Sequence, residues 1–164
     1  MKTKHFYPLL FALIFLSFAS QAQNYYLYYP GITVGKGVKG HQDEVYLYAL
    51  SNGFTKPNPT SPPSFADYSV IKNNDVTSID MQKLAVLGTS TDGVEIRVYA
   101  TASPSAVLTI QLKGVTISSY SISGSSQDGG CATCSGFTES ISLNYTAVKI
   151  GTFMWNLTTN TPAY

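Results

Sequence analysis

Apolar and polar residues alternate with a period of two through two stretches in the second half of the chain, residues 107–122 and 137–145. Alternation of this kind in β-branched and aromatic residues indicates strands with one buried face. The alternating apolar positions are Leu108, Ile110, Leu112, Val115, Ile117, Ile141, Leu143 and Tyr145. Gly114 separates two runs of opposite parity, where a bulge or bend would exchange the inward face. The two stretches are predicted to pair across a loop rich in Gly and Ser.

Shorter apolar runs predict further strands elsewhere. They are residues 24–29, 43–50, 65–72, 94–100 and 147–157. The segment after Tyr145 therefore ends in one last strand, and residues 158–164 are expected to fray. About seven or eight short strands with one helix are typical of a mainly β protein, a β-barrel or sandwich.

The one helical pattern follows the strand at 65–72. Thr77 or Ser78 can cap its N-terminus, and Asp80 lies in the first turn, where a negative charge complements the helix dipole. Met81, Leu84 and Ala85 recur on one face, and a glycine follows at position 88. The pattern predicts a helix of about three turns at one end or side of the barrel.

The N-terminal 22 residues have the pattern of a secretory signal peptide. Lys2 and Lys4 precede an apolar core, and Ser20 and Ala22 are the small residues that a signal peptidase requires. The alternative is a membrane anchor, but about 13 apolar residues fall short of the roughly 20 that span a bilayer. We predict cleavage after Ala22, a single mature domain at 23–164, and a secreted or periplasmic location.

Charge and composition exclude some classes of partner. Charged residues are only 12% of the chain, and ten basic residues face nine acidic ones. Removal of Lys2 and Lys4 with the signal peptide leaves eight basic residues, which changes the formal net charge from +1 to −1. No basic patch remains for a phosphate backbone, so we expect no nucleic-acid binding and, after signal removal, no membrane association.

Cys131 and Cys134 are separated by two residues in the Gly/Ser-rich loop. A zinc site needs four ligands, and the mature chain adds only His41. A redox motif expects a helix after the second cysteine, and none is predicted. Export favours a local disulfide between the two cysteines, and an intersubunit disulfide or a free pair of thiols are the alternatives.

Catalytic and cofactor signals are weak. His41 lies near Asp43 and Glu44, but no Gly-x-Ser-x-Gly motif supplies a nucleophile, so a turn histidine is the better interpretation. The glycine-bearing loop at 35–40 lacks the Gly-Lys-Ser/Thr ending of a phosphate-binding loop. We therefore expect no enzyme activity and no cofactor or metal.

Residues 56–63 contain four prolines. Such a segment cannot join a central ladder and favours a stiff, extended conformation. It is either a surface loop between strands or an arm that reaches a neighbouring subunit.

Two motifs carry a family resemblance. Leu-Lys-Gly-Val-Thr-Ile-Ser-Ser-Tyr-Ser-Ile at 112–122, followed by Thr-Glu-Ser-Ile-Ser-Leu-Asn-Tyr at 138–145, resembles the haemolysin-coregulated protein family, the tube proteins of the type VI secretion system. The glycine loop ending before His41, the helix near Asp80 and the strand bearing Glu95 follow in the expected order. The resemblance covers nearly the whole mature chain.

The resemblance implies two β-sheets that form a barrel with one short helix at its side. It further implies a hexameric ring of identical chains that stacks into a tube, with secretion-machine components or exported effectors as further partners. Glu139 matches a recurrent family position and is interpreted as a structural acid, paired with Lys113 or Lys149. The alternative function is a secreted, non-enzymatic module that binds a protein or a glycan through the same barrel.

By position, the proline-rich segment corresponds to the family's extended loop, which contacts neighbouring subunits. The residues assigned to that contact are Lys56, Pro57, Asn58, Pro59, Pro62 and Pro63.

Overall fold

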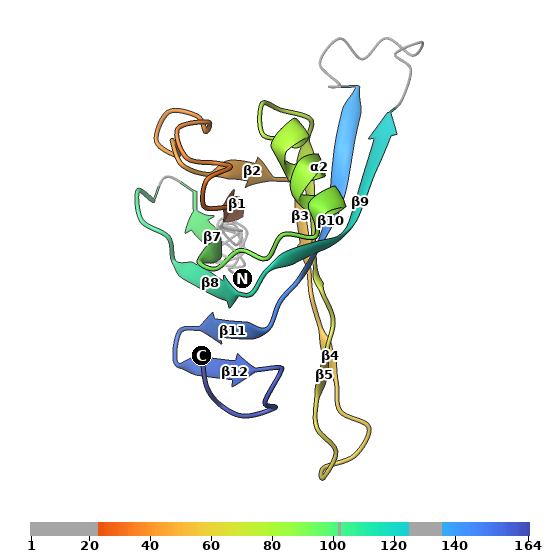
Figure 1. The fold of residues 1–164 in the computed structure, drawn as a ribbon. Helices are drawn as coiled ribbons and strands as arrows, with labels where there is room; N and C mark the ends of the chain where they lie inside the picture. The colour runs from red at the N-terminus through yellow and green to blue at the C-terminus, as the bar shows by residue number, and fades with distance from the viewer. Residues whose placement is uncertain (1–22, 102, 125–135) are drawn as a thin grey trace, which may run out of the picture.

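A computed structural model describes residues 23–101, 103–124 and 136–164 (Figure 1). The predicted signal peptide and both cysteines lie outside the described residues. The strands are β1 (Gln23–Tyr28), β2 (Val45–Leu47), β3 (Ala49–Ser51), β4 (Phe54–Thr55), β5 (Ser64–Phe65), β6 (Tyr68–Asn73), β7 (Val94–Ala100), β8 (Leu108–Lys113), β9 (Thr116–Gly124), β10 (Phe137–Asn144), β11 (Ala147–Ile150) and β12 (Phe153–Asn156). The helix is α2 (Ser78–Leu87).

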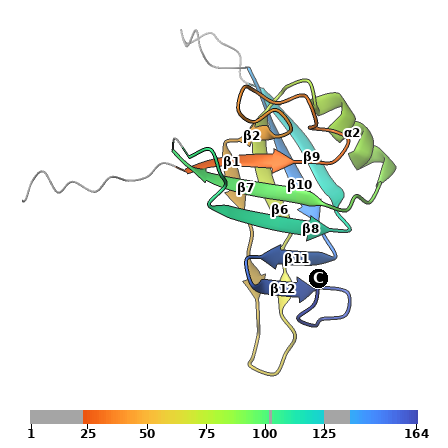
Figure 2. The same cartoon turned by 90° about the vertical axis from the view of Figure 1, so that its left-hand side faces the viewer.

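The strands form two main antiparallel sheets that face each other (Figure 2). One has six strands in the order β12-β11-β8-β7-β1-β2, and the other has four in the order β3-β6-β10-β9. β4 and β5 form a separate two-stranded ribbon. The mainly β, two-sheet class with one helix is confirmed, although neither described sheet closes on itself. The described residues hold twelve strands rather than seven or eight. The predicted strands 43–50, 65–72, 107–122 and 147–157 are each divided in two, and β4 was not predicted.

The chain passes between the two sheets at sharp junctions. β2 and β3 flank Tyr48 and belong to different sheets, as do β8 and β9 on either side of the Gly114–Val115 junction. Gly114 has a φ of 58°, and a Cβ there would collide with the Thr146 side chain. The predicted bend at this glycine is therefore confirmed. The predicted pairing is confirmed for β9 with β10, whereas β8 pairs with β7 and β11 in the other sheet.

The core lies between the two sheets and is formed by the inward-facing side chains of each strand. Burial of these side chains is the main term that stabilises the fold, at roughly 25 cal/mol per Å² of apolar surface removed from water. Its fully buried members include Leu27, Leu47, Val70, Met81, Val94, Ile96, Leu112, Ile141 and Leu143. Met81 is the helix's contribution, so the predicted inward face of α2 is confirmed at that residue.

α2 begins and ends where the sequence predicts, but its N-terminal residue makes a different contact from the one expected. Thr77 is the N-cap residue, but its hydroxyl donates to Asp75 Oδ1 at 2.6 Å instead of capping a helix amide. Gly88 ends the helix with a left-handed φ of 61°. Asp80 forms an ion pair with Lys36 at 2.7 Å, which ties the glycine-bearing loop to the first turn of the helix.

The C-terminal segment is ordered, so the expected fraying is wrong. The Asn156 amide donates to the Thr161 carbonyl at 2.9 Å, and the Tyr164 ring lies 4.3 Å from Lys113 Nζ. A cation over an aromatic face is attractive and holds the last residue against the six-stranded sheet. This contact could not be predicted from local sequence patterns, because its two partners are 51 positions apart.

Candidate functional site

His41 is part of a packed cluster. Its Nδ1 lies 2.7 Å from Glu44 Oε1, and its ring stacks on Tyr26 with centroids 3.8 Å apart. The Tyr99 hydroxyl donates to the same Glu44 oxygen at 2.7 Å. Within the described residues no nucleophile joins this cluster, and no group of three or more His, Cys, Asp or Glu could hold a metal ion. The geometry fits a structural role for His41.

The two sheets present outer faces of different character. The outer face of the six-stranded sheet carries both charges and aromatic rings. Arg97 pairs with Glu95 at 2.7 Å, and its guanidinium lies 4.7 Å from the centre of the Tyr28 ring. Lys113 and Lys149 lie on the same face, both beside Tyr164.

The strands of the four-stranded sheet carry no charged side chain on its outer face, which we call the serine face. Asp67 borders this face and accepts hydrogen bonds from Ser118 and Asn144. The side chains of the face, placed by the strand pairing, are Ala49, Ser51, Ser69, Ile71, Asn73, Ser119, Ser121, Ser123, Thr138, Ser140 and Ser142. One row crosses all four strands as Ser51, Ser69, Ser142 and Ser119. Sequence reasoning missed this face, although alternating serines in β9 and β10 were its signal.

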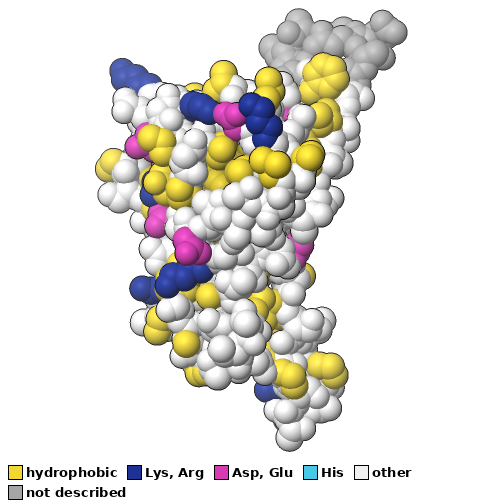
Figure 3. All heavy atoms as spheres, in the orientation of Figure 1, with side chains coloured by type: hydrophobic (Ala, Val, Ile, Leu, Met, Phe, Trp, Pro, Cys, Tyr) yellow, Lys and Arg dark blue, Asp and Glu magenta, His cyan; other side chains and the backbone are white. Residues whose placement is uncertain are grey.

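β9 is an edge of the four-stranded sheet, with no strand paired beyond it among the described residues. α2 packs against β9, and the Tyr120 hydroxyl donates to the Ser78 carbonyl at 3.5 Å, but the helix does not pair with the backbone of the edge. The strand is nine residues long and contains no charge and no proline. Soluble proteins usually protect a long edge with Lys, Pro or a covering element, because its free backbone groups invite another strand. Figure 3 shows the described end of the β9–β10 hairpin covered by uncharged side chains. The edge is therefore suited to contact with another chain.

The proline-rich segment lies at the tip of the β4–β5 ribbon, which projects away from both sheets (Figures 1 and 2). We call residues 54–65 the arm. Its strands pair only through Phe54–Phe65 and Thr55–Ser64. Between them Asn58 Oδ1 accepts the amides of Thr60 and Ser61, at 3.1 and 2.8 Å, and so forms a turn. All six residues assigned to the contact lie in this tip.

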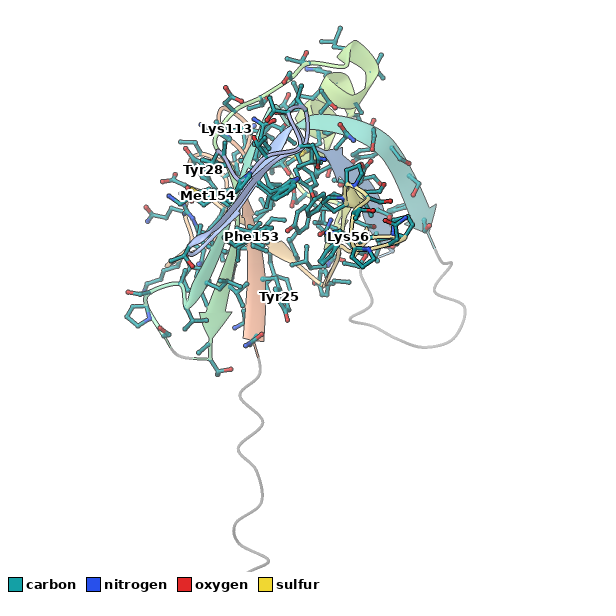
Figure 4. All side chains as sticks on the ribbon, turned by 90° about the horizontal axis from the view of Figure 1, so that it is seen from below. Tyr25, Tyr28, Lys56, Lys113, Phe153 and Met154 are labelled. Atoms are coloured by element: carbon teal, nitrogen blue, oxygen red, sulfur yellow. The ribbon has the colours of Figure 1, made fainter. Side chains whose placement is uncertain are left out.

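An apolar groove opens between the base of the arm and β11–β12. Its volume is about 420 Å³, and we call it the aromatic groove. It is lined by Asn52, Gly53, Phe54, Phe65, Tyr68, Tyr145, Val148, Ile150 and Phe153. Phe54 and Phe153 are 64% and 47% exposed, so the rim of the groove is open to solvent. Viewed from below, Lys56 of the arm lies on the opposite side of the molecule from Tyr28, Lys113 and Met154 (Figure 4).

Glu139 is fully buried and pairs with Lys72, which is also fully buried, at 2.8 Å. The interpretation that it pairs with Lys113 or Lys149 is wrong, because both lysines lie on the outer face of the other sheet. Asn74 donates to the second Glu139 oxygen at 2.6 Å. Lys72 also contacts Asp75 at 3.1 Å and the Ser78 hydroxyl at 3.2 Å. The pair thus links β6, β10 and the start of α2.

The electrostatics of this pair follow from its contacts. Burial alone would raise the pKa of Glu139, but the hydrogen bond from Lys72 and those from Ser78 and Tyr120 hold that pKa below its usual range. Burial, together with the neighbouring carboxylate of Glu139, raises the pKa of Tyr120 to about 12. Glu139 is therefore ionised in the folded protein at neutral pH.

Comparison with known proteins finds a family model that matches most of the chain. The model of the family described as "Type VI secretion system effector, Hcp" matches residues 26–151. No curated protein matches the chain. Among the described residues no helix is both long and apolar enough to cross a membrane.

Solved structures agree with the fold. A structure described as a type six secretion system protein has a TM-score of 0.72 at 21% identity, covering 85% of this chain and 99% of that one. Hcp1 from Salmonella typhimurium also has a TM-score of 0.72, at 15% identity, covering 87% and 99%. Hcp1 from Flavobacterium johnsoniae has a TM-score of 0.64 at 7% identity, covering 81% and 98%.

Proposed function

The chain belongs to the Hcp family of the type VI secretion system, and from that premise we propose that it is a structural subunit of a hexameric ring. Rings of this kind stack into a hollow tube that carries exported effectors, with no chemistry performed by the subunit. The mature subunit is residues 23–164, exported after cleavage at Ala22 and working outside the cytoplasm.

The open edge of β9 is the observation that best supports assembly. Its free backbone groups can pair with a strand from a second copy, a common mode of recognition between chains. β3 is the opposite edge of the same sheet. A contact between two different edges is heterologous, and such contacts form a closed ring when the rotation per subunit closes. The strands of the serine face carry no charged side chain there, so they add no repulsion between neighbouring copies.

Light scattering on the purified protein, read during size-exclusion chromatography, tests this proposal. We expect about six times the mass of one chain. Lysines at the edge, in a Ser119→Lys/Ser121→Lys variant, should shift the protein to monomer, because charges on an edge strand block pairing. Thr109→Lys on the outer face of the other sheet is the matched control and should keep the assembly. A wild-type protein that is monomeric at all micromolar concentrations would refute the ring.

A pair of exposed tyrosines supports a second candidate function, a secreted module that binds a glycan or a protein. Tyr46 and Tyr48 are 40% and 58% exposed, and their rings meet edge to face at 5.0 Å. Amphipathic rings in this position suit a partner that is partly apolar and partly polar. This function predicts a monomer or dimer and saturable heat of binding in a calorimetric titration with a soluble neutral oligosaccharide. Absence of binding by the isolated protein, together with a six-fold mass, would reject it.

A further inference from the structure

The aromatic groove has the chemistry of a site for a proline-rich segment. Five of its nine lining residues are Phe or Tyr, and Trp155 packs beside it with its ring 6.3 Å from that of Phe65. Grooves lined by aromatic rings bind proline-rich segments because the rings pack against the flat pyrrolidines. Such a segment loses little entropy on binding, since its extended conformation is already formed.

Two donors near the groove lack partners within the described chain. They are the Tyr145 hydroxyl and Trp155 Nε1, both buried. The Asn52 side-chain amide donates to the Ala66 carbonyl at 2.7 Å and also interacts with the Tyr145 oxygen as a donor, so it gives the Tyr145 O–H no acceptor. A buried donor without a partner is destabilising, because it has lost its hydrogen bonds to water and gained none in return. An occupant that displaces the rim rings could offer backbone carbonyls to both donors.

The same chain carries a segment with the matching chemistry. Residues 56–63 hold four prolines, and Pro57, Pro59 and Pro62 are exposed. Proline has no backbone N–H, so such a segment presents carbonyls that need outside donors. The arm leads its own tip away from its own groove, beyond β12 (Figures 1 and 2). The tip is therefore placed to reach a different copy.

We propose that the proline-rich tip of one copy occupies the aromatic groove of a neighbouring copy. The two surfaces differ, so every copy uses its tip toward one neighbour and its groove toward another, which makes the contact heterologous and repeatable. The inference rests on the proposed assembly and names the surface that receives the arm and the chemistry that holds it there.

Mixed cross-linking tests which surface receives the tip. In a Cys131→Ser/Cys134→Ser background, one protein carries Pro59→Cys and the other Phe153→Cys on the groove rim. The matched control partner carries Met154→Cys, on the opposite face of the same strand. After mixing, reassembly and oxidation, we expect at least tenfold more disulfide-linked dimer with Phe153→Cys than with Met154→Cys. Equal yields, or a larger yield with Met154→Cys, would overturn the inference.

Light scattering on the same mixtures distinguishes a failure of the groove proposal from a failure of the proposed ring. If the protein assembles but the Phe153→Cys cross-link does not form, the ring proposal stands and the groove does not bind the arm. A chain that never assembles removes both.

A second measurement needs no cysteine. Trp155 is the only tryptophan of the chain, so its emission reports on the groove. Replacement of Pro57, Pro59, Pro62 and Pro63 by Ala should weaken assembly at least tenfold and make Trp155 emission independent of protein concentration. Pro104→Ala, in a distant loop, is the control and should behave as wild type. Unchanged assembly and emission in the arm variant would also overturn the inference.

Discussion

Replacement of Glu139 by Gln should strongly destabilise the fold. The substitution keeps the shape of the side chain but removes the charge that faces Lys72, whose side chain is fully buried. Breaking one partner of a buried pair costs about 3–5 kcal/mol, because the remaining charge stays buried without compensation. Asp75, 3.1 Å from Lys72 Nζ, remains as a partial partner. The loss should therefore lie near about 3 kcal/mol, the lower end of that range.

Urea unfolding at one fixed protein concentration measures this loss, because assembly adds to apparent stability. The midpoint should fall with little change in slope. Thr138→Ala, at the exposed neighbouring position of β10, should change stability by no more than about 0.5 kcal/mol. A Lys72→Met/Glu139→Leu double variant should recover most of the loss, since apolar replacement of a whole buried pair is often neutral. A Glu139→Gln loss below about 1 kcal/mol would refute the reasoning.

Two further predictions follow from the structure, and a third follows from the sequence. The pKa of Glu139 is lowered in the folded state, so its stabilising effect is complete above the unfolded pKa of about 4.3 and is lost as the pH falls through the lower folded value. As the pH is lowered, the urea midpoint should therefore fall less steeply in the Glu139→Gln variant than in the wild type. Parallel curves for the two proteins would contradict this prediction. Gly37→Ala should lower the free energy of unfolding by about 1–3 kcal/mol, because the added Cβ would collide with the backbone oxygens of His41 and Glu44. The control is Gly53→Ala, whose Cβ would meet no atom within 4 Å. Equal melting temperatures for the two variants would contradict the clash. Mass spectrometry of alkylated, unreduced protein should find no free thiol if Cys131 and Cys134 form a disulfide, whereas two modified thiols per chain would reject it.

The strands that the sequence predicted best are those with strict alternation. In β10, Ile141 and Leu143 share the inward parity, and the structure buries both. The helix was placed by its glycine stop and its apolar face, since Gly88 and Met81 are both where the pattern put them. These features are local, so they can be read without knowing the rest of the chain.

The buried ion pair between Lys72 and Glu139 could not be predicted from local sequence patterns. Lys72 continues the inward parity of Tyr68 and Val70, and Glu139 begins the inward parity of β10. Two opposite charges at inward positions of separate strands were a signal that they meet, but only the pairing of β6 with β10 makes them neighbours. The passage between sheets at Tyr48 was missed for the same reason. Alternation is continuous there, and the break depends on which sheet each half joins.

The mass of the purified protein in solution tests the central claim most directly. If the chain is a subunit of a hexameric ring, light scattering will give about six times the mass of one chain, and negative-stain images of the same peak will show rings with a central opening. A single monomeric species across micromolar concentrations, with no rings in the images, would contradict the proposed function.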